Sequence, residues 1–207
     1  MIQEIKKLIE LVNQKYNLFG FIAPNHMTLH AIALAKEKHQ GQTDLLGNNY
    51  FQNHIRGVTR NVLGLLNELR EQADIHCCGD IDAEEEYCNW MGLGEFVSTV
   101  AYLHDIFEDT DVVPDNLREM RYPELIVEAI RSVTRRPNEK YKYFIKRSKK
   151  NILGRLVKMA DLQNNLDIRR IKFSVETEKQ DLYRIKKYIK SYLFLEDKMS
   201  EEDYLRK

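Results

Sequence analysis

The residues best suited to chemistry lie in one short stretch of the chain, from Ala101 to Thr110. It contains the adjacent pair His104 and Asp105, followed by Glu108 and Asp109. An imidazole and a carboxylate in one helical turn are ligands that suit manganese, iron or zinc. Glu108 follows His104 by four residues and Asp109 follows Asp105 by four, so each pair shares a helix face. The stretch therefore predicts part of a metal site.

Two residues elsewhere in the chain are candidates to complete this site. Asp161 lies in a mainly apolar segment from Leu156 to Leu166, where a carboxylate needs a cation or hydrogen-bond donors to offset its desolvation. His54 lies near the start of another apolar segment; taken alone, it is more simply explained as a hydrogen-bonded or exposed helix histidine. Together with His104 and Asp105, the two residues give the ligand set of a mononuclear metal site.

The elements that must position these residues are helices. Apolar residues recur at helical spacing, as in Ile55, Val58, Val62 and Leu65, and no alternating segment is long enough for a persuasive strand. We expect a break at 17–24, a loop at 41–49, and an acidic loop at 72–89 with at most a short helix at 83–87. The pattern predicts an all-α fold with helices over residues 2–12, 26–39, 50–69, 93–106, 114–120, 123–133, 140–147, 151–170 and 176–194.

Composition limits the class of protein and its partners. With 207 residues the default expectation is one domain, and 32 basic residues balance 32 acidic ones, so no overall field attracts nucleic acid or an anionic membrane. No apolar run approaches the roughly 20 residues of a membrane span. The N-terminal residues from Met1 to Lys7 are charged where a signal peptide is apolar. We expect a soluble, cytoplasmic protein with no membrane or nucleic-acid polymer as partner.

The three cysteines offer a second, weaker metal hypothesis. Their odd number and the adjacency of Cys77 and Cys78 argue against a disulfide framework. Free thiols in a loop are the simpler interpretation. A structural zinc site built from these two residues with His76 and Cys88 is the alternative, although adjacent cysteines are poorly spaced for a tetrahedral site.

The ordered motifs resemble a known superfamily. His54, His104 with Asp105, and Asp161 follow the order and contexts of the HD-domain metal-dependent phosphohydrolases. The wider strings resemble the hydrolase domain of RelA/SpoT-type enzymes, including the stand-alone small alarmone hydrolases. The resemblance spans roughly residues 28–170, and its strings are His39-Gln40-Gly41-Gln42-Thr43, Tyr50, Leu103-His104-Asp105, Glu108-Asp109-Thr110, Val133-Thr134, and Leu156 to Asp161 with Asn165.

This resemblance implies a fold, a reaction and a set of site residues. The fold would be an HD-type helical bundle forming a single domain over residues 1–207, with a C-terminal helix at about 176–196 packed on it. The reaction would remove the 3′-pyrophosphate of (p)ppGpp or a related nucleotide with a divalent metal, generally Mn²⁺. The metal ligands would be His54, His104, Asp105 and Asp161, with Glu108 and Asp109 handling the water and the leaving group. In the resembling motifs Gln42, Tyr50 and Asn165 would bind the substrate. Arg135, Arg136, Lys140 and Lys158 are cations near the motifs that suit a polyphosphate ligand, and for the lysines at 140–150 a solvated basic helix face is an equal alternative.

The sequence departs from that pattern in the loop at 41–49. Asp44 and Asn49 stand where the resembling enzymes usually carry a basic residue and a proline, and that basic residue helps to hold the nucleotide. Two alternatives follow. One is an HD-type hydrolase of another phosphorylated nucleotide or a phosphodiester, and the other is a non-catalytic nucleotide-binding protein that has kept the scaffold.

Overall fold

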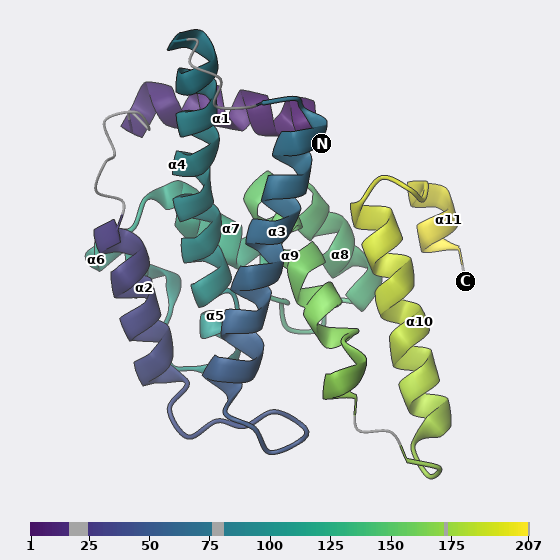
Figure 1. Ribbon diagram of the computed structural model, residues 1–207. Helices are drawn as coiled ribbons and strands as arrows, with labels where there is room; N and C mark the ends of the chain where they lie inside the picture. Colours follow the sequence, from purple (N-terminus) through teal and green to yellow (C-terminus); the bar gives the residue numbers. More distant parts are fainter. Residues whose placement is uncertain (17–24, 76–80, 172–173, 207) are drawn as a thin grey trace.

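The computed structural model of the chain describes residues 1–16, 25–75, 81–171 and 174–206. Within these ranges it is helical, without strands and with a single isolated bridge between Thr43 and Asn49, so the predicted all-α fold is confirmed (Figure 1). The elements in chain order are α1 (Ile2–Tyr16), α2 (Asn25–Lys38), the π-helix η2 (Phe51–Ile55), α3 (Arg56–Gln72), α4 (Ile81–Leu103), α5 (Ile106–Asp109), α6 (Pro114–Glu119), α7 (Glu124–Val133), α8 (Tyr141–Lys149), α9 (Ile152–Asn165), the 3₁₀-helix η3 (Ile168–Arg170), α10 (Glu178–Leu195) and α11 (Glu201–Leu205).

The helix α3 forms the centre of the bundle. It packs between α4 and α9, while α2 covers α4 and α10 lies against α9 (Figure 1). The contact faces follow from apolar residues at helical spacing, because a stripe repeating every three or four residues lies on one side of a helix. In α3 this buried stripe is Val58, Val62, Leu65 and Leu66, and the facing stripe of α9 includes Leu156, Val157 and Ala160.

Small residues allow the closest helix contacts near the site. Gly57 in α3 faces Asn164 in α9 so tightly that a Cβ at position 57 would collide with the Asn164 amide. Gly154 in α9 meets Ser132 of α7 in the same way. In both places the absence of a side chain lets a polar group approach the neighbouring backbone, and at Gly57 that group belongs to the site described below.

A buried arginine connects the two ends of the described chain to the core. The Arg155 side chain, in α9, is 2% exposed. Its Nε donates to the Leu195 carbonyl oxygen at 2.6 Å, its Nη1 lies 3.1 Å from Glu4 in α1, and its Nη2 pairs with Asp197 after α10. Pairing of this kind is needed because an unpaired buried guanidinium is strongly destabilising.

Three predicted boundaries differ from the structure. The acidic segment is helical from Ile81 onward, because Trp90 and Leu93 continue the buried face of α4 backward even though its many acidic residues resemble a loop. His104 and Asp105 follow the end of α4 at Leu103 instead of lying inside a helix that continues to residue 106. The helix predicted over 151–170 ends at Asn165. The predicted break at 17–24 lies outside the described residues.

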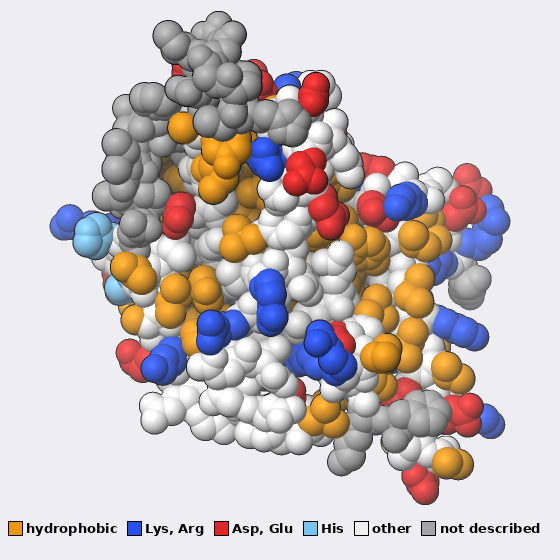
Figure 2. All heavy atoms as spheres, in the orientation of Figure 1, with side chains coloured by type: hydrophobic (Ala, Val, Ile, Leu, Met, Phe, Trp, Pro, Cys, Tyr) orange, Lys and Arg blue, Asp and Glu red, His pale blue; other side chains and the backbone are white. Residues whose placement is uncertain are grey.

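The surface shows no concentration of charge of one sign on the face in view, where acidic and basic side chains are interspersed (Figure 2). This agrees with the equal numbers of the two kinds in the sequence.

Of the helices that the structure describes, none combines the length and apolar character that crossing a membrane requires.

Candidate metal centre and its cavity

His54 is presented by an unusual turn at the start of α3. Residues Phe51–Ile55 form a π-helix, in which the N–H of Arg56 donates to the Phe51 carbonyl oxygen five residues earlier. A π turn inserts one extra residue into the helical repeat, and such turns are frequent at functional sites. His54 is only 4% exposed, so the turn directs its imidazole into the protein interior.

The pair His104 and Asp105 lies in the tight connection between α4 and α5. Asp105 has φ −99° and ψ 1°, a backbone conformation that occurs at turns and in many active sites. Its carbonyl oxygen accepts the N–H groups of Glu108 at 3.1 Å and Asp109 at 2.9 Å, which starts α5. The tight connection therefore brings Asp105, Glu108 and Asp109 to the lining of one cavity, with His104 Nε2 3.0 Å from Asp105 Oδ2.

The third contribution comes from the last two turns of α9. The Asp161 side chain is 7% exposed, and one of its oxygens, Oδ2, accepts from Lys158 Nζ at 2.7 Å. The other oxygen, Oδ1, accepts from Asn165 Nδ2 at 2.6 Å. The lysine and the amide offset the cost of burying this carboxylate, and they also fix its orientation.

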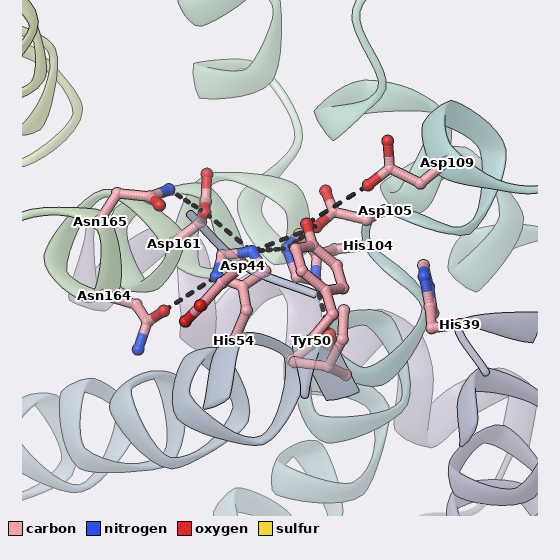
Figure 3. A network of polar contacts seen from close by, with 12 residues as sticks. His39, Asp44, Tyr50, His54, His104, Asp105, Asp109, Asp161, Asn164 and Asn165 are labelled. Atoms are coloured by element: carbon pink, nitrogen blue, oxygen red, sulfur yellow. Dashed lines mark hydrogen bonds and ion pairs between the residues drawn. The ribbon is translucent and has the colours of Figure 1, made fainter. Parts of the chain in front are cut away.

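These three elements bring the four predicted ligands together (Figure 3). Ligand atoms of His54, His104 and Asp161 lie within 4.8 Å of one another. Asp105 Oδ2 lies 3.1 Å from His54 Nε2 and 3.0 Å from His104 Nε2, while the two Nε2 atoms are 3.2 Å apart. Neighbouring ligands around one ion with bonds of about 2.1 Å are separated by roughly 3 Å. The group fits a divalent metal ion in both geometry and donor chemistry.

The second nitrogen of each histidine is held in the way that metal binding requires. His104 Nδ1 lies 2.8 Å from the Ala101 carbonyl oxygen, and His54 Nδ1 lies 2.8 Å from Asn164 Oδ1. Beside the Ala101 carbonyl oxygen, the neutral His104 ring carries its proton on Nδ1 and presents the Nε2 lone pair to the centre. His54 Nδ1 also lies 3.0 Å from Arg170 Nη1, a donor, and the Nε2 atom of His54 faces the centre. Such outer contacts are typical of histidine ligands and fix both tautomer and ring orientation.

The electrostatics of the metal-free group reflect its crowding. Burial opposes a charge on His104, but the nearby carboxylates of Asp105 and Asp161 outweigh it and raise the pKa of His104 to about 9. Burial likewise opposes ionisation of the two aspartates; His104 lowers the pKa of Asp105, and Lys158 lowers that of Asp161. The carboxylates thus stay ionised and attract a cation, either a proton or a metal.

A cavity of about 390 Å³ opens onto this centre. Glu108 and Asp109 line it, and the surrounding protein partly desolvates both carboxyl groups and raises their pKa. Glu108 also accepts the backbone N–H of Arg135. A carboxyl with a raised pKa beside a candidate metal site is suited to proton transfer.

Three of the predicted substrate-binding residues, Tyr50, Asn165 and Lys158, contact the predicted metal ligands directly. The Tyr50 hydroxyl donates to Asp105 Oδ2 at 2.6 Å and to Asp109 Oδ2 at 3.3 Å, and it lines the cavity together with Asn165. Burial and the nearby carboxylates raise the pKa of Tyr50, so it acts as a proton donor in these contacts.

The other predicted substrate-binding residues are distributed around the cavity. Gln42 bridges His39 Nδ1 and the Asp109 carbonyl oxygen. Arg135 and Arg136 line a neighbouring cavity of about 1010 Å³, which shares Glu108 with the first. Lys140 is exposed at the start of α8 and lines neither cavity.

Some residues of the site were missed from the sequence. Asn164 supports His54, and its spacing of three residues from Asp161 on a buried helix was a usable signal. Arg170, Arg184 and Tyr188 line the cavity but come from η3 and α10. No local sequence pattern connects these residues with the metal motifs.

The alternative zinc site falls mainly outside the described residues, since these do not include His76, Cys77 or Cys78. The fourth residue, Cys88, lies in α4 and is exposed. The metal-ligating group found among the described residues is the one formed by His54, His104 and Asp161.

Comparisons with known proteins add one finding. No family model and no curated protein matches the sequence. A solved structure with a similar fold belongs to a metazoan ortholog of SpoT that hydrolyzes ppGpp and plays a role in starvation responses. The two chains superpose with a TM-score of 0.52 and 21% identity, over 83% of this chain and 92% of that one. The chain therefore shares the helical fold of that hydrolase.

Proposed function

We propose that this protein is a metal-dependent phosphohydrolase that removes the 3′-pyrophosphate from (p)ppGpp or a closely related nucleotide. The observation that carries the proposal is the convergence of His54, His104, Asp105 and Asp161, with both Nδ1 atoms turned outward, at the floor of a cavity that also contains Glu108 and Asp109. A pure binding module has little use for the last two groups.

The metal we propose is Mn²⁺, held by the two Nε2 atoms and the carboxylates of Asp105 and Asp161. A mixed imidazole and carboxylate set suits this ion. When bound, it would lower the pKa of water and neutralise phosphoryl charge. The surrounding residues prepare the site, because Lys158 and Tyr50 fix the orientation of the two carboxylates beside the imidazoles.

Glu108 and Asp109 are the groups that we assign to proton transfer. Water attacks the phosphorus atom bonded to O3′, and the P–O3′ bond breaks to give pyrophosphate and a free 3′-hydroxyl. One carboxylate orients the water and accepts its proton, while the other returns a proton to the leaving oxygen. Glu108, fixed by the Arg135 N–H, is our assignment for the water side, and Asp109 for the leaving group.

The neighbouring basic cavity supports a substrate with more than one phosphate group. Arg131, Arg135, Arg136 and Lys150 contribute cations to its lining, and Glu108 separates it from the metal cavity. An arginine fork matches phosphate geometry. We assign the phosphates remote from the scissile bond to this side, with Arg136 as the main contact because its guanidinium makes no hydrogen bond or ion pair with the described residues.

A hydrolysis panel tests the proposal. Purified protein with Mn²⁺ is incubated with ppGpp, pppGpp, GDP, GMP, dGTP and cyclic nucleotides, and released pyrophosphate and phosphate are measured. We expect pyrophosphate from ppGpp and pppGpp, abolished by Asp105→Ala and retained in Asp111→Ala, an exposed aspartate that pairs with Lys38. No pyrophosphate from either alarmone would contradict the proposal.

A second candidate is hydrolysis of another phosphorylated nucleotide or a phosphodiester by the same residues. It is favoured by Asp44, which lines the cavity where the resembling enzymes carry a basic residue. Turnover of a mononucleotide, a dNTP or a cyclic nucleotide in the same panel, with ppGpp untouched, would select it. Metal binding without turnover of any compound would select a non-catalytic nucleotide-binding protein.

A further inference from the structure

The metal cavity has far more negative than positive side chains in its lining. Two cations, Arg170 and Arg184, face five carboxylates, which are Asp44, Asp105, Glu108, Asp109 and Asp161. A phosphate-bearing ligand is repelled by such a wall unless a metal and further cations offset it. Arg184 Nη2 is paired with Asp181 at 2.8 Å. Arg170 lies 3.8 Å from its ion-pair partner, Asp44, so it is the less strongly paired of the two lining cations.

Arg170 is mostly but not fully buried, and it uses only part of its hydrogen-bonding capacity. Its side chain is 13% exposed. Its hydrogen bonds leave from Nη1, which donates to Asn164 Oδ1 and, at 3.3 Å, to the Asn164 carbonyl oxygen, and which also lies 3.0 Å from His54 Nδ1. Its Nε is buried and has no hydrogen-bond partner in the part of the chain that the structure describes. A guanidinium offers five N–H donors in a planar fork, so donors remain for a ligand.

Asp44 is fixed beside this guanidinium without closing on it. Its Oδ1 accepts the backbone N–H groups of Leu46 at 3.0 Å and Asn48 at 2.9 Å, and its Oδ2 accepts from Asn53 at 2.9 Å. Asp44 Oδ2 lies 3.8 Å from Arg170 Nε, within reach of Coulomb attraction but beyond hydrogen-bond distance. The aspartate is thus a rigid counter-charge that orients Arg170.

We infer that Arg170 binds a phosphate group of the substrate and that Asp44 holds it in the binding position. The inference rests on the proposed function for the identity of the substrate and adds to it a specificity-determining residue. It also explains the acidic residue at position 44. The loop at 41–49 lacks the basic residue of the resembling enzymes, and Arg170 of η3 supplies a cation instead. Asp44 in the loop provides the negative charge that orients the Arg170 guanidinium.

The test compares Arg170→Met and Arg170→Lys with the matched control Arg169→Met. Arg169 is the adjacent residue, 84% exposed and paired with Asp167. The Mn²⁺-loaded variants are assayed for KM and kcat with ppGpp and for binding of inorganic pyrophosphate by calorimetry. We expect Arg170→Met to raise KM and the pyrophosphate Kd by about 10- to 100-fold, as for loss of a charge-assisted fork, with Arg170→Lys intermediate and Arg169→Met unchanged.

A purely structural role would give a different pattern. If Arg170 only positioned Asn164 and His54, Arg170→Met would lower Mn²⁺ affinity and kcat while the pyrophosphate Kd stayed constant, and the inference would be overturned. Arg170→Lys keeps the charge, so it tests the inference even if the methionine variant fails to fold. Should the parent protein hydrolyse no alarmone, the pyrophosphate Kd values still decide on Arg170, because they do not depend on turnover. Equal pyrophosphate binding by parent and Arg170→Met, or none by the parent, refutes the inference.

Discussion

At the scale of single residues, the site is a set of donors and acceptors that constrain one another. Asp105 Oδ2 accepts from Tyr50 and lies near both histidine Nε2 atoms. Asn164 Oδ1 receives both His54 Nδ1 and Arg170 Nη1. Each ligand orientation thus depends on a residue that does not itself ligate, which is typical of metal centres.

Tyr50→Phe should separate orientation of Asp105 from substrate binding. Removing the hydroxyl takes a donor from Asp105 and from Asp109, so we expect metal affinity or kcat to fall by about 10- to 100-fold with KM nearly unchanged. Tyr143→Phe is the control, since Tyr143 is 49% exposed. Steady-state kinetics over a Mn²⁺ series measure both. A change confined to KM would instead favour the substrate contact predicted from the sequence.

The raised pKa of His104 predicts opposite pH trends for stability and metal binding. Its value rises from 6.5 to about 9 in the folded, metal-free protein. The stabilisation from its bound proton is therefore complete below pH 6.5 and lost as the pH rises through 9. A metal must displace this proton, so its affinity should increase by up to about tenfold per pH unit over that window.

Thermal melting of the chelator-treated protein and competition titration of Mn²⁺, each between pH 6 and 9.5, check these trends. His30→Gln is the control. His30 lies in α2, where it contacts Tyr122, and it does not line the metal cavity. Metal affinity that is flat across this range would contradict the assignment of His104 as a ligand protonated in the free protein.

Residue types could be predicted at this scale far better than contacts. Asp161 could be selected because a carboxylate among apolar residues needs a partner, and His104 and Asp105 because four ionisable groups cluster there. His54 became a candidate only together with these residues. The position of Arg170 beside Asp44 could not be predicted, since it depends on how the chain after α9 meets the loop before η2. The spacing of apolar residues carries no information on how these two segments meet.

At the scale of elements, the close contact between α3 and α9 determines the geometry of the site. Gly57 admits the Asn164 side chain beneath His54. We expect Gly57→Ala to displace Asn164, to lower Mn²⁺ affinity by about 10- to 100-fold and to destabilise the protein by about 1–3 kcal/mol.

Gly64→Ala is the matched control for this change. It lies in the same helix, but a Cβ there would meet no atom within 4 Å. It should be neutral or stabilising by about 0.5–1 kcal/mol, because alanine favours a helix more than glycine does. Urea unfolding and metal titration of both variants make the comparison. Equal behaviour of the two variants would show that the helix contact does not control the site.

Helices were predictable from periodicity, but their ends near the site were not. The π turn at His54 and the end of α4 before His104 both depart from a regular repeat, and tertiary contacts decide such departures. The acidic segment at 72–89 was predicted as a loop for another reason. Exposed Glu85 and Cys88 obscure the fact that Trp90 and Leu93 face the core.

At the scale of the whole molecule, Arg155 ties α1 and the segment after α10 to the core helix α9. Arg155→Met removes the buried donor to the Leu195 carbonyl oxygen and the partner of two half-exposed carboxylates, Glu4 and Asp197. We expect a loss of about 1–3 kcal/mol in the free energy of unfolding. Arg60→Met, an exposed change in α3, should shift it by less than about 0.5 kcal/mol.

Urea unfolding followed both by far-UV circular dichroism and by fluorescence of Trp90, which is the one tryptophan of the chain, measures these values. The same experiment tests the single domain predicted over residues 1–207, because coincident transitions are expected of one cooperative unit. Separate transitions would contradict it. The single domain and the cytoplasmic location stay predictions.

The shared acceptor Asn164 Oδ1 has a thermodynamic consequence. One oxygen atom holds the imidazole on the metal side and the guanidinium on the phosphate side. If Arg170 binds phosphate as inferred, any shift of this amide changes both occupancies together. The two binding equilibria are then coupled, and by reciprocity the factor by which the metal alters phosphate affinity equals the factor by which phosphate alters metal affinity. The Asn164 side-chain amide would thus link the binding of the metal to the binding of the phosphate group.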